Sequence, residues 1–173
     1  MEIPASQLVI ADLNEVNLIS FYECFCSLMR EGYGQFPTQL QEYFLDHDYT
    51  LANFKVWIDR NFRKVILAIN QENKVVGFLI GDHAYGGVCF ISWFGLLKEY
   101  RLQGIGSQML RKYIEYAHIR KAHLIELYTY NGASGFYEKH GFKLIGKREQ
   151  GFFGQKNLIM NLKLRDFNIN DII

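Results

Sequence analysis

The segment from Leu96 to Ser107 has the residue types and spacing best suited to chemistry. Gly104 and Gly106 lie between an apolar run and a segment whose apolar residues recur at helical spacing. Because glycine has no side chain, successive backbone N–H groups can converge in such a turn, and the helix dipole adds partial positive charge. The segment therefore predicts an anion site suited to a pyrophosphate. The alternative is a strand-to-helix turn that uses glycine only for tight geometry.

Two common nucleotide-binding patterns fail on this segment. The dinucleotide fingerprint G-x-G-x-x-G would need a third glycine at the position of Met109. The phosphate-binding loop of nucleotide hydrolases requires G-K-[ST], which occurs nowhere in the chain. The anion site therefore requires a different ligand.

Two blocks of sequence, separated by a predicted helix and a predicted strand, extend the pattern. Arg101–Gly106 reads R-L-Q-G-I-G, and Asn131–Phe142 reads N-G-A-S-G-F-Y-E-K-H-G-F. These blocks resemble the R/Q-x-x-G-x-G/A and N-x-x-A…F-Y-E-K-x-G-F motifs of the GNAT superfamily of acetyl-CoA-dependent N-acetyltransferases. Lys98 stands where the family often has proline. The resemblance covers about Val65 to Leu162.

The resemblance implies that acetyl-CoA binds as cosubstrate in a cleft where the sheet splays open, between the strand ending at Leu96 and the strand ending at Thr129. The pantetheine arm would pair with the strand backbone, and the pyrophosphate would lie on the loop amides. The residues that the resemblance assigns to the cofactor are Phe94, Gly95, Leu96, Arg101, Leu102, Gln103, Gly104, Ile105, Gly106, Ser107, Tyr130, Asn131, Ser134, Tyr137 and Lys139.

Tyr137 matches the family tyrosine whose hydroxyl faces the CoA sulfur, so the resemblance implies a general acid for the departing thiolate. The alternative is a core aromatic residue with a hydrogen-bonded hydroxyl. Many relatives carry an asparagine seven residues earlier, where this chain has Tyr130. Asn131 is displaced by one position, and either contacts the pantetheine or forms an Asn-Gly turn with Gly132.

The sequence assigns no general base. Many relatives carry a glutamate at the position of Ser92, two residues ahead of Phe94. Serine cannot deprotonate an ammonium, but it can position a water molecule that does so. Asp82, His83 and Glu126 are further candidates, each with a structural role as the alternative. A chain of water molecules without a single base is also compatible with the chemistry, because a thioester is already activated.

Two aromatic segments bear on the acceptor. Glu31–Phe36 lies where relatives place the acceptor-binding loop, and Gly151–Gly154 lies between the last two predicted strands. Each segment either contacts an amine substrate or belongs to the core.

The periodicity of apolar residues predicts the elements that position these sites. Strands are expected at Gln7–Ala11, Lys64–Asn70, Lys74–Gly81, Val88–Leu97, His123–Thr129, Phe142–Gly146 and Lys156–Leu164. Helices are expected from Asp12 to about Arg30, from Thr38 to Phe62 with a break near Asp46–Tyr49, at Ile105–Ile119, and in a short segment before Gly141. This order, β-αα-βββ-α-β-α-ββ, predicts one α/β (α+β) domain over residues 1–173, with a GNAT-like mixed, mostly antiparallel sheet of six to seven strands.

The starts of the first two helices carry capping-box patterns. Asp12–Glu15 has Asp12 as the expected N-cap, and Thr38–Gln41 follows Pro37. The first helix is expected to bury its apolar stripe, which consists of Leu18, Phe21, Phe25, Leu28 and Met29.

Composition excludes several classes of protein. The 173 residues are 49% hydrophobic with only 2 prolines, which excludes a disordered or collagen-like chain. No apolar run could span a bilayer, and Met1–Pro4 does not begin a signal peptide, so a cytoplasmic protein is expected. The three cysteines (Cys24, Cys26 and Cys89) lack metal-ligand spacing, so we expect buried thiols rather than nucleophiles, disulfides or a metal site.

The formal charge of +1 offers no support for a nucleic-acid surface, but it conceals an uneven distribution. Residues 1–97 carry 6 basic and 11 acidic side chains, whereas residues 98–148 carry 10 and 4. The basic segment coincides with the predicted cofactor motifs, where Arg101, Lys112 and Lys139 are candidates for the phosphates. The acidic N-terminal part favours a cationic acceptor.

The sequence predicts an enzyme that transfers the acetyl group of acetyl-CoA directly to a primary amine of a small molecule or peptide. The alternative is a catalytically impaired acyl-CoA-binding sensor or partner module of the same fold, a reading that the absence of a carboxylate at Ser92 favours. The acceptor, a longer acyl donor and a homodimer are left open.

Overall fold

The computed structural model describes residues 8–34 and 36–171, which divide into two compact units. The first unit comprises the residues up to Ile80 together with Trp93–Lys112, and the second comprises Gly81–Ser92 and the residues from Tyr113 onward. Strand β4 (Val88–Leu96) and helix α4 (Ile105–Ile119) contribute to both units. The glycine loop therefore belongs to the first unit and the Tyr137 segment to the second.

Seven strands form a mixed sheet in the order β1-β2-β3-β4-β5-β7-β6. Besides β4, the strands are β1 (Val9–Asp12), β2 (Lys64–Ile69), β3 (Val75–Gly81), β5 (Leu124–Thr129), β6 (Lys143–Arg148) and β7 (Asn157–Lys163). β1 pairs antiparallel with β2, and β7 pairs antiparallel with both β5 and β6, whereas β4 and β5 are parallel. A parallel pair needs a crossover connection, which α4 supplies. The predicted mixed, mostly antiparallel sheet is confirmed.

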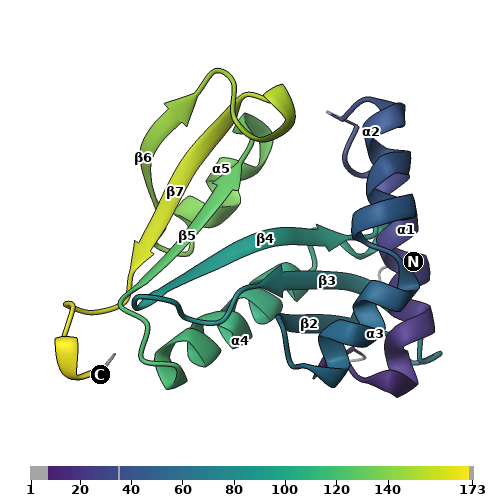
Figure 1. Cartoon of the computed structure of the whole chain (residues 1–173), viewed down its shortest axis with the longest axis horizontal. Coiled ribbons are helices and arrows are strands. Elements are labelled where there is room, and N and C mark those ends of the chain that lie inside the picture. Colours follow the sequence, from purple (N-terminus) through teal and green to yellow (C-terminus); the bar gives the residue numbers. More distant parts are fainter. Residues whose placement is uncertain (1–7, 35, 172–173) are drawn as a thin grey trace. The chain divides into compact units, whose positions relative to one another are not determined.

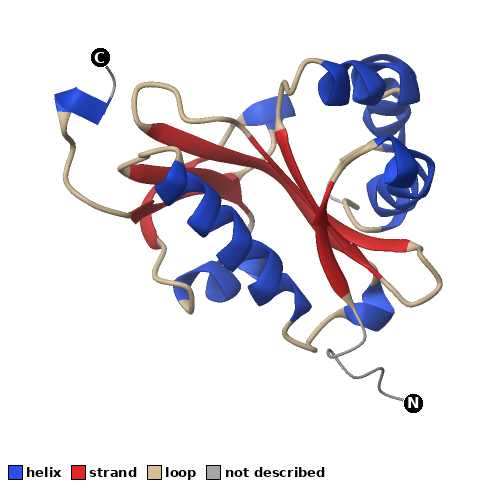
Figure 2. Cartoon of the chain, turned by 90° about the horizontal axis from the view of Figure 1, so that it is seen from below, coloured by secondary structure: helices blue, strands red, loops and turns tan. Residues whose placement is uncertain are grey.

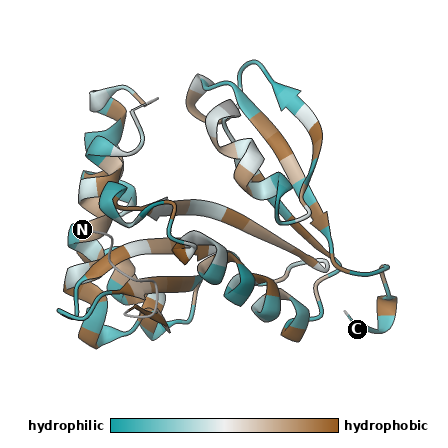
Figure 3. Ribbon diagram, turned by 180° about the vertical axis from the view of Figure 1, so that it is seen from behind, coloured by the Kyte–Doolittle hydropathy of each residue, from teal (hydrophilic) through white to brown (hydrophobic). Residues whose placement is uncertain are grey.

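In the first unit, helices α1 (Leu18–Glu31), α2 (Thr38–Tyr43) and α3 (Leu51–Asp59) lie on one face of β2 and β3 (Figures 1 and 2). Hydrophobic residues run along both strands (Figure 3). The rings of Phe21 and Phe54 meet edge-to-face with centroids 4.8 Å apart, and both rings are fully buried. All five residues of the apolar stripe predicted for the first helix are buried, as expected.

In the second unit, the short helix α5 (Asn131–Glu138) lies against one face of the strands β5 and β7 (Figure 1). Ile125 and Leu127 alternate with half-buried residues along β5, and Met160 is fully buried on β7. Gly141, with φ of 86°, ends this helical segment, and a Cβ at this position would lie 3.3 Å from Leu162 Cδ1. On β5, Tyr128 packs against Phe152 of a short 3₁₀ helix, Phe152–Gly154, with ring centroids 5.4 Å apart.

The predicted first capping box is wrong. β1 extends through Asp12, whose carboxylate forms ion pairs with Lys64 at 2.6 Å and Lys112 at 3.5 Å. The cap is instead Asn14, whose side chain accepts from the amides of Val16 and Asn17 before a short 3₁₀ turn leads into α1.

The second predicted capping box is also wrong, because Pro37 is the N-cap of α2 and no side chain caps that helix. The predicted break after it is confirmed. A π-helical turn at Phe44–Asp48 ends the α2 segment, and Thr50 caps α3 by accepting from the amide of Asn53 at 3.2 Å.

Candidate active site

The loop between β4 and α4 has two residues in the left-handed backbone region. Leu102 has φ of 61° and Gly104 has φ of 79°. This alternation turns neighbouring N–H groups to one side and forms a concave nest for an anion. Within the described chain, the amides of Leu102, Gln103 and Gly104 donate to no backbone carbonyl, and the first amides of α4 have no partner within the helix. These features are compatible with an anion site at the loop, and binding of a pyrophosphate there stays a prediction.

Side chains of the same unit brace this loop. Arg101 donates from Nε to the carbonyl of Leu96 at 2.8 Å, and Gln103 donates from Nε2 to the carbonyl of Glu99 at 2.8 Å. Each hydrogen bond connects a loop side chain to a backbone carbonyl four or five residues earlier. The loop therefore holds its shape through its own contacts, without a ligand. The hydrogen bond to Leu96 uses only the Nε of Arg101, so its terminal guanidinium nitrogens can still contact a phosphate. The role of Arg101 as a cofactor contact stays a prediction.

Leu102 is the feature of the loop that sequence analysis did not anticipate. A bulky residue at positive φ is rare and costs free energy, and Leu102 is also fully exposed. Its residue type gives no local signal for this conformation. The remaining predicted loop residues, Ile105, Gly106 and Ser107, form the first turn of α4 as expected.

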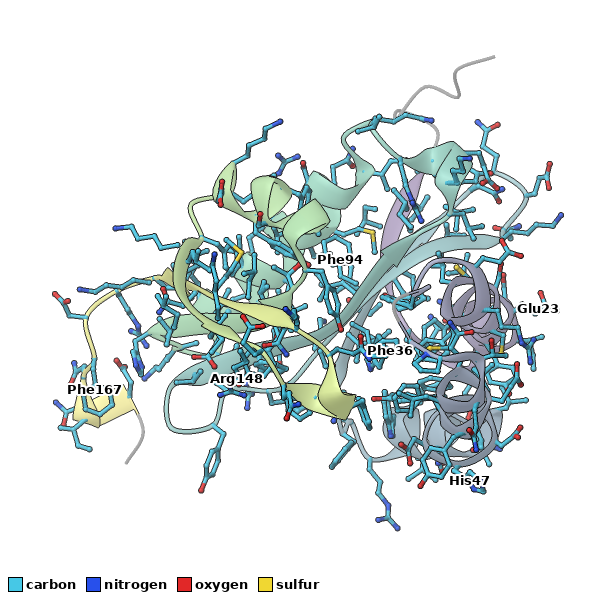
Figure 4. The ribbon with its side chains drawn as sticks, turned by 90° about the horizontal axis from the view of Figure 1, so that it is seen from above. Glu23, Phe36, His47, Phe94, Arg148 and Phe167 are labelled. Atoms are coloured by element: carbon cyan, nitrogen blue, oxygen red, sulfur yellow. The ribbon has the colours of Figure 1, made fainter. Side chains whose placement is uncertain are left out.

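The three strand residues predicted for the pantetheine arm, Phe94, Gly95 and Leu96, form the end of β4. All three are half-buried, and Figure 4 labels Phe94. A side chain at Gly95 would place its Cβ 2.9 Å from Leu28 Cδ1 and 3.2 Å from the Tyr33 hydroxyl. A larger residue here would therefore require the side chains of Leu28 and Tyr33 to shift. The parallel pairing of β4 with β5 covers Val88–Ile91, ahead of these residues.

Tyr137 lies on α5 and is 8% exposed. Burial raises the pKa of its phenol above the ordinary value, so the hydroxyl stays protonated at neutral pH. Its ring packs against Phe136 and Phe142, with centroids 5.2 and 5.6 Å away. The side chain is thus packed between two rings and keeps a protonated hydroxyl that can donate a proton or a hydrogen bond.

The other predicted residues of this segment lie around α5. Tyr130 is its N-cap, Ser134 is half-buried, and Lys139 is the exposed C-cap. Because the helix begins at Asn131, the alternative of an Asn-Gly turn at positive φ does not hold. The side chain of Asn131 is outside the part of the chain that the structure describes. Gly132 and Gly135 have no atoms within 4 Å of the position of a Cβ, so the side of α5 that carries them is open.

The candidates for a general base all belong to the second unit. His83 hydrogen-bonds through Nδ1 to the hydroxyl of Tyr116, which favours a structural role. The backbone of Asp82 donates to the carbonyl of Phe90 at 2.8 Å. Glu126 is half-buried on β5 opposite Asn161. Ser92 is half-buried immediately after the last β4 residue paired with β5.

The two aromatic segments predicted for the acceptor differ in exposure. Phe36 is 7% exposed and belongs to the core, and Tyr33 packs edge-to-face on Trp93 at 5.1 Å. Gln35 lies outside the described residues. Phe152 and Phe153 are 57% and 51% exposed, so the second segment does not belong to the core.

Lys112, a candidate for the phosphates, contacts the N-terminal strand instead. It donates from Nζ to the carbonyl of Ile10 at 3.2 Å and pairs with Asp12. These contacts favour a structural role. In the described part of the chain, no cluster of acidic, histidine and cysteine side chains could hold a metal ion, and no helix has the length and apolarity to cross a membrane.

The cysteines are poor nucleophiles. Burial raises the pKa of Cys24 to about 12 and that of Cys89 to about 11, and it also raises the pKa of half-buried Cys26. Since only the thiolate reacts, we expect iodoacetamide at neutral pH to leave Cys24 and Cys89 unmodified until the protein unfolds. Peptide mass mapping of native and urea-unfolded protein measures this. Rapid labelling of Cys89 in the native state would contradict it.

A family model described as "Acetyltransferase (GNAT) family" matches residues 21–142. The chain belongs to this family. The match covers the glycine loop, β5 and the Tyr137 helix, and it identifies the chain as an acetyltransferase with acetyl-CoA as cosubstrate, as the motifs implied.

Solved structures resemble this acetyltransferase over nearly its whole length. The PaiA N-acetyltransferase of Thermoplasma acidophilum, in complex with coenzyme A, is 19% identical, with 90% of this chain and 98% of that chain covered and a TM-score of 0.73. The ribosomal-protein-S18-alanine N-acetyltransferase of Escherichia coli is 18% identical, with 94% and 97% covered and a TM-score of 0.68. These similarities show the shared fold. No curated protein matches the acetyltransferase in sequence.

Proposed function

We propose that this acetyltransferase transfers the acetyl group of acetyl-CoA directly to a primary amine of a small molecule or peptide. The observation that carries the proposal is the nest of backbone amides at Leu102–Gly104, which is braced by the side chains of Arg101 and Gln103. Such a nest, at the start of a long helix, suits the pyrophosphate of acetyl-CoA. The residues Phe94–Leu96 would hold the pantetheine arm through their backbone groups.

The transfer needs a neutral amine, a stabilised oxyanion and a protonated leaving group. The amine nitrogen forms a bond to the thioester carbonyl carbon, the carbon–sulfur bond breaks, and the sulfur takes up a proton. In our proposal the Tyr137 hydroxyl supplies that proton or a hydrogen bond. Ser92 positions a water that accepts the proton lost by the amine.

Acetyl-CoA is expected to stabilise the folded protein. At a concentration of 100 Kd, the ligand should add about 2.7 kcal/mol to the free energy of unfolding. Differential scanning fluorimetry with acetyl-CoA measures this as an increase in Tm, and adenosine serves as a control that lacks the pyrophosphate and the pantetheine arm. An unchanged Tm at saturating acetyl-CoA would refute the proposed cofactor site.

A sensor or partner module of the same fold is the second candidate, because Ser92 cannot act as a base. A panel of amines assayed for release of free CoA separates the two. Release of CoA that depends on the amine supports the enzyme, whereas binding of acetyl-CoA without release of CoA on any amine supports the sensor.

The cysteines bear on the cellular location. The three thiols are free, and two of them are buried, which favours a reducing compartment. We therefore propose that the protein is cytoplasmic.

A further inference from the structure

A stacked cation lies on the face of the second unit opposite α5. The guanidinium carbon of Arg148 lies 4.9 Å from the centroid of the Tyr128 ring. The same ring contacts Phe90 at 5.0 Å and Phe152 at 5.4 Å. We call these four residues the Arg148 cluster. Figure 4 labels Arg148 beside the ribbons of β6 and β7.

The register of the strands explains why residues distant in sequence meet here. Arg148 on β6 is paired with Asn157 on β7, and Tyr128 on β5 is paired with Ile159. Asn157 and Ile159 are two residues apart and point to one face, so Arg148 and Tyr128 share that face. The neighbour Lys147 is paired with Leu158, so it belongs to the face that α5 covers.

The guanidinium of Arg148 has no acidic partner among the residues that the structure describes. The adjacent carboxylate of Glu149 is paired with Lys156 at 2.7 Å. The contact with Tyr128 is made over the face of the ring, as in a cation–π interaction, and not through a hydrogen bond from the guanidinium. Arg148 is therefore a cation that contacts an aromatic ring and whose N–H donors remain available for a bidentate carboxylate.

The surroundings of the cluster favour a ligand with an apolar part. Phe152 and Phe153 expose 57% and 51% of their surface. Phe153 has φ of 55°, a strained conformation that is concentrated at functional sites. The β4–β5 ladder ends at the pair Ile91 and Leu127. Ser92 is the next residue after Ile91 on β4, and Tyr128 is the next residue after Leu127 on β5. The cluster therefore lies next to the residue proposed to hold the water.

We infer that the Arg148 cluster binds the acceptor and that the acceptor carries a carboxylate in addition to its amine. The inference rests on the proposed function, and it names the substrate class of that site. Arg148 binds the carboxylate, while Tyr128 and Phe152 hold the apolar part. Preorganisation by the ring reduces the entropy lost on binding. The expectation of a cationic acceptor, drawn from the acidic N-terminal part, is the competing outcome.

The test uses pairs of amines that differ only in the carboxylate, namely phenylalanine with phenethylamine and lysine with cadaverine. We expect the unaltered protein to prefer the carboxylated member. In Arg148→Met, KM for that member should rise about tenfold or more with kcat within about twofold, because a charge-assisted contact is lost. KM for the other member should stay constant. Tyr128→Leu should also raise KM for the carboxylated member.

Lys147→Met is the matched control, since it removes an equal charge one residue away on the opposite face, and it should change neither KM. Equal effects of Arg148→Met on both members, or a preference for the amines without carboxylate, would overturn this inference while leaving the acetyltransferase proposal intact. Binding of acetyl-CoA without turnover of any amine would overturn both, and absence of acetyl-CoA binding would refute the proposed function itself.

Discussion

Replacing Gly104 by valine is expected to lower the affinity for acetyl-CoA at least about 100-fold, which corresponds to about 2.7 kcal/mol. Gly104 has φ of 79°, and nothing lies within 4 Å of the position of its Cβ. The Cβ of the added side chain therefore meets no protein atom, and we expect the side chain to compete with the ligand for the space at the loop amides. The backbone strain costs about 1–2 kcal/mol of stability. Isothermal titration calorimetry with acetyl-CoA measures the loss.

Gly86 supplies a matched control for this substitution. It has φ of 57° and open space around its Cβ position, but it lies in the connection between β3 and β4 of the other unit. Gly86→Val should show similar destabilisation and unchanged affinity for acetyl-CoA. Equal loss of affinity in both variants would mean that backbone strain, rather than a blocked anion nest, causes the effect.

Replacing Tyr137 by phenylalanine is expected to lower kcat about 100-fold or more, with the affinity for acetyl-CoA unchanged, because only the hydroxyl is removed. Steady-state kinetics and calorimetry give the two quantities. Tyr113→Phe is the control. Tyr113 is also buried, but its hydroxyl donates to the carbonyls of Asp82 at 2.8 Å and Phe90 at 3.2 Å. Tyr113→Phe should lower the free energy of unfolding by about 0.5–1.5 kcal/mol and leave kcat unchanged.

The pH dependence provides a further check on Tyr137. Burial raises the pKa of its phenol above the ordinary value, so the acid form persists as the pH rises. The neutral fraction of the amine acceptor increases over the same range. We therefore expect kcat/KM to increase with pH and then level off, without a decline up to about pH 10. A decline beginning near neutral pH in the unaltered protein but absent from Tyr137→Phe would contradict the raised pKa, because it would show that Tyr137 loses its proton in that range.

Local sequence patterns were sufficient where neighbouring residues determine the structure. The apolar spacing of Ile105–Ile119 predicts the bounds of α4, and the glycine at position 104 accommodates the left-handed backbone ahead of it, whereas the anion site there stays a prediction. Both depend on interactions over one or two turns of chain, namely helical periodicity and the conformational freedom of glycine. The order of the predicted elements then leads to the mixed sheet, which is confirmed.

Contacts between distant residues decided the rest. The sequence pattern predicts Asp12 as a helix N-cap. In the structure, Lys64, which lies 52 residues later, donates from Nζ to the Asp12 carboxylate at 2.6 Å, and Asn14 is the N-cap of the 3₁₀ turn before α1. The position of Phe36 in the core depends on rings from other elements. The left-handed conformation of Leu102 has no local signal.

The sequence by itself therefore determined the order of the elements, the glycine loop and the match of Tyr137 to its family motif. Only the tertiary structure brought Arg148 onto the ring of Tyr128, because β7 lies between their strands and pairs with both. Strand register is set by the whole sheet, and a shift of one residue would move either side chain to the opposite face. A surface of this kind cannot be recognised from local spacing, which is why it emerged only from the structure.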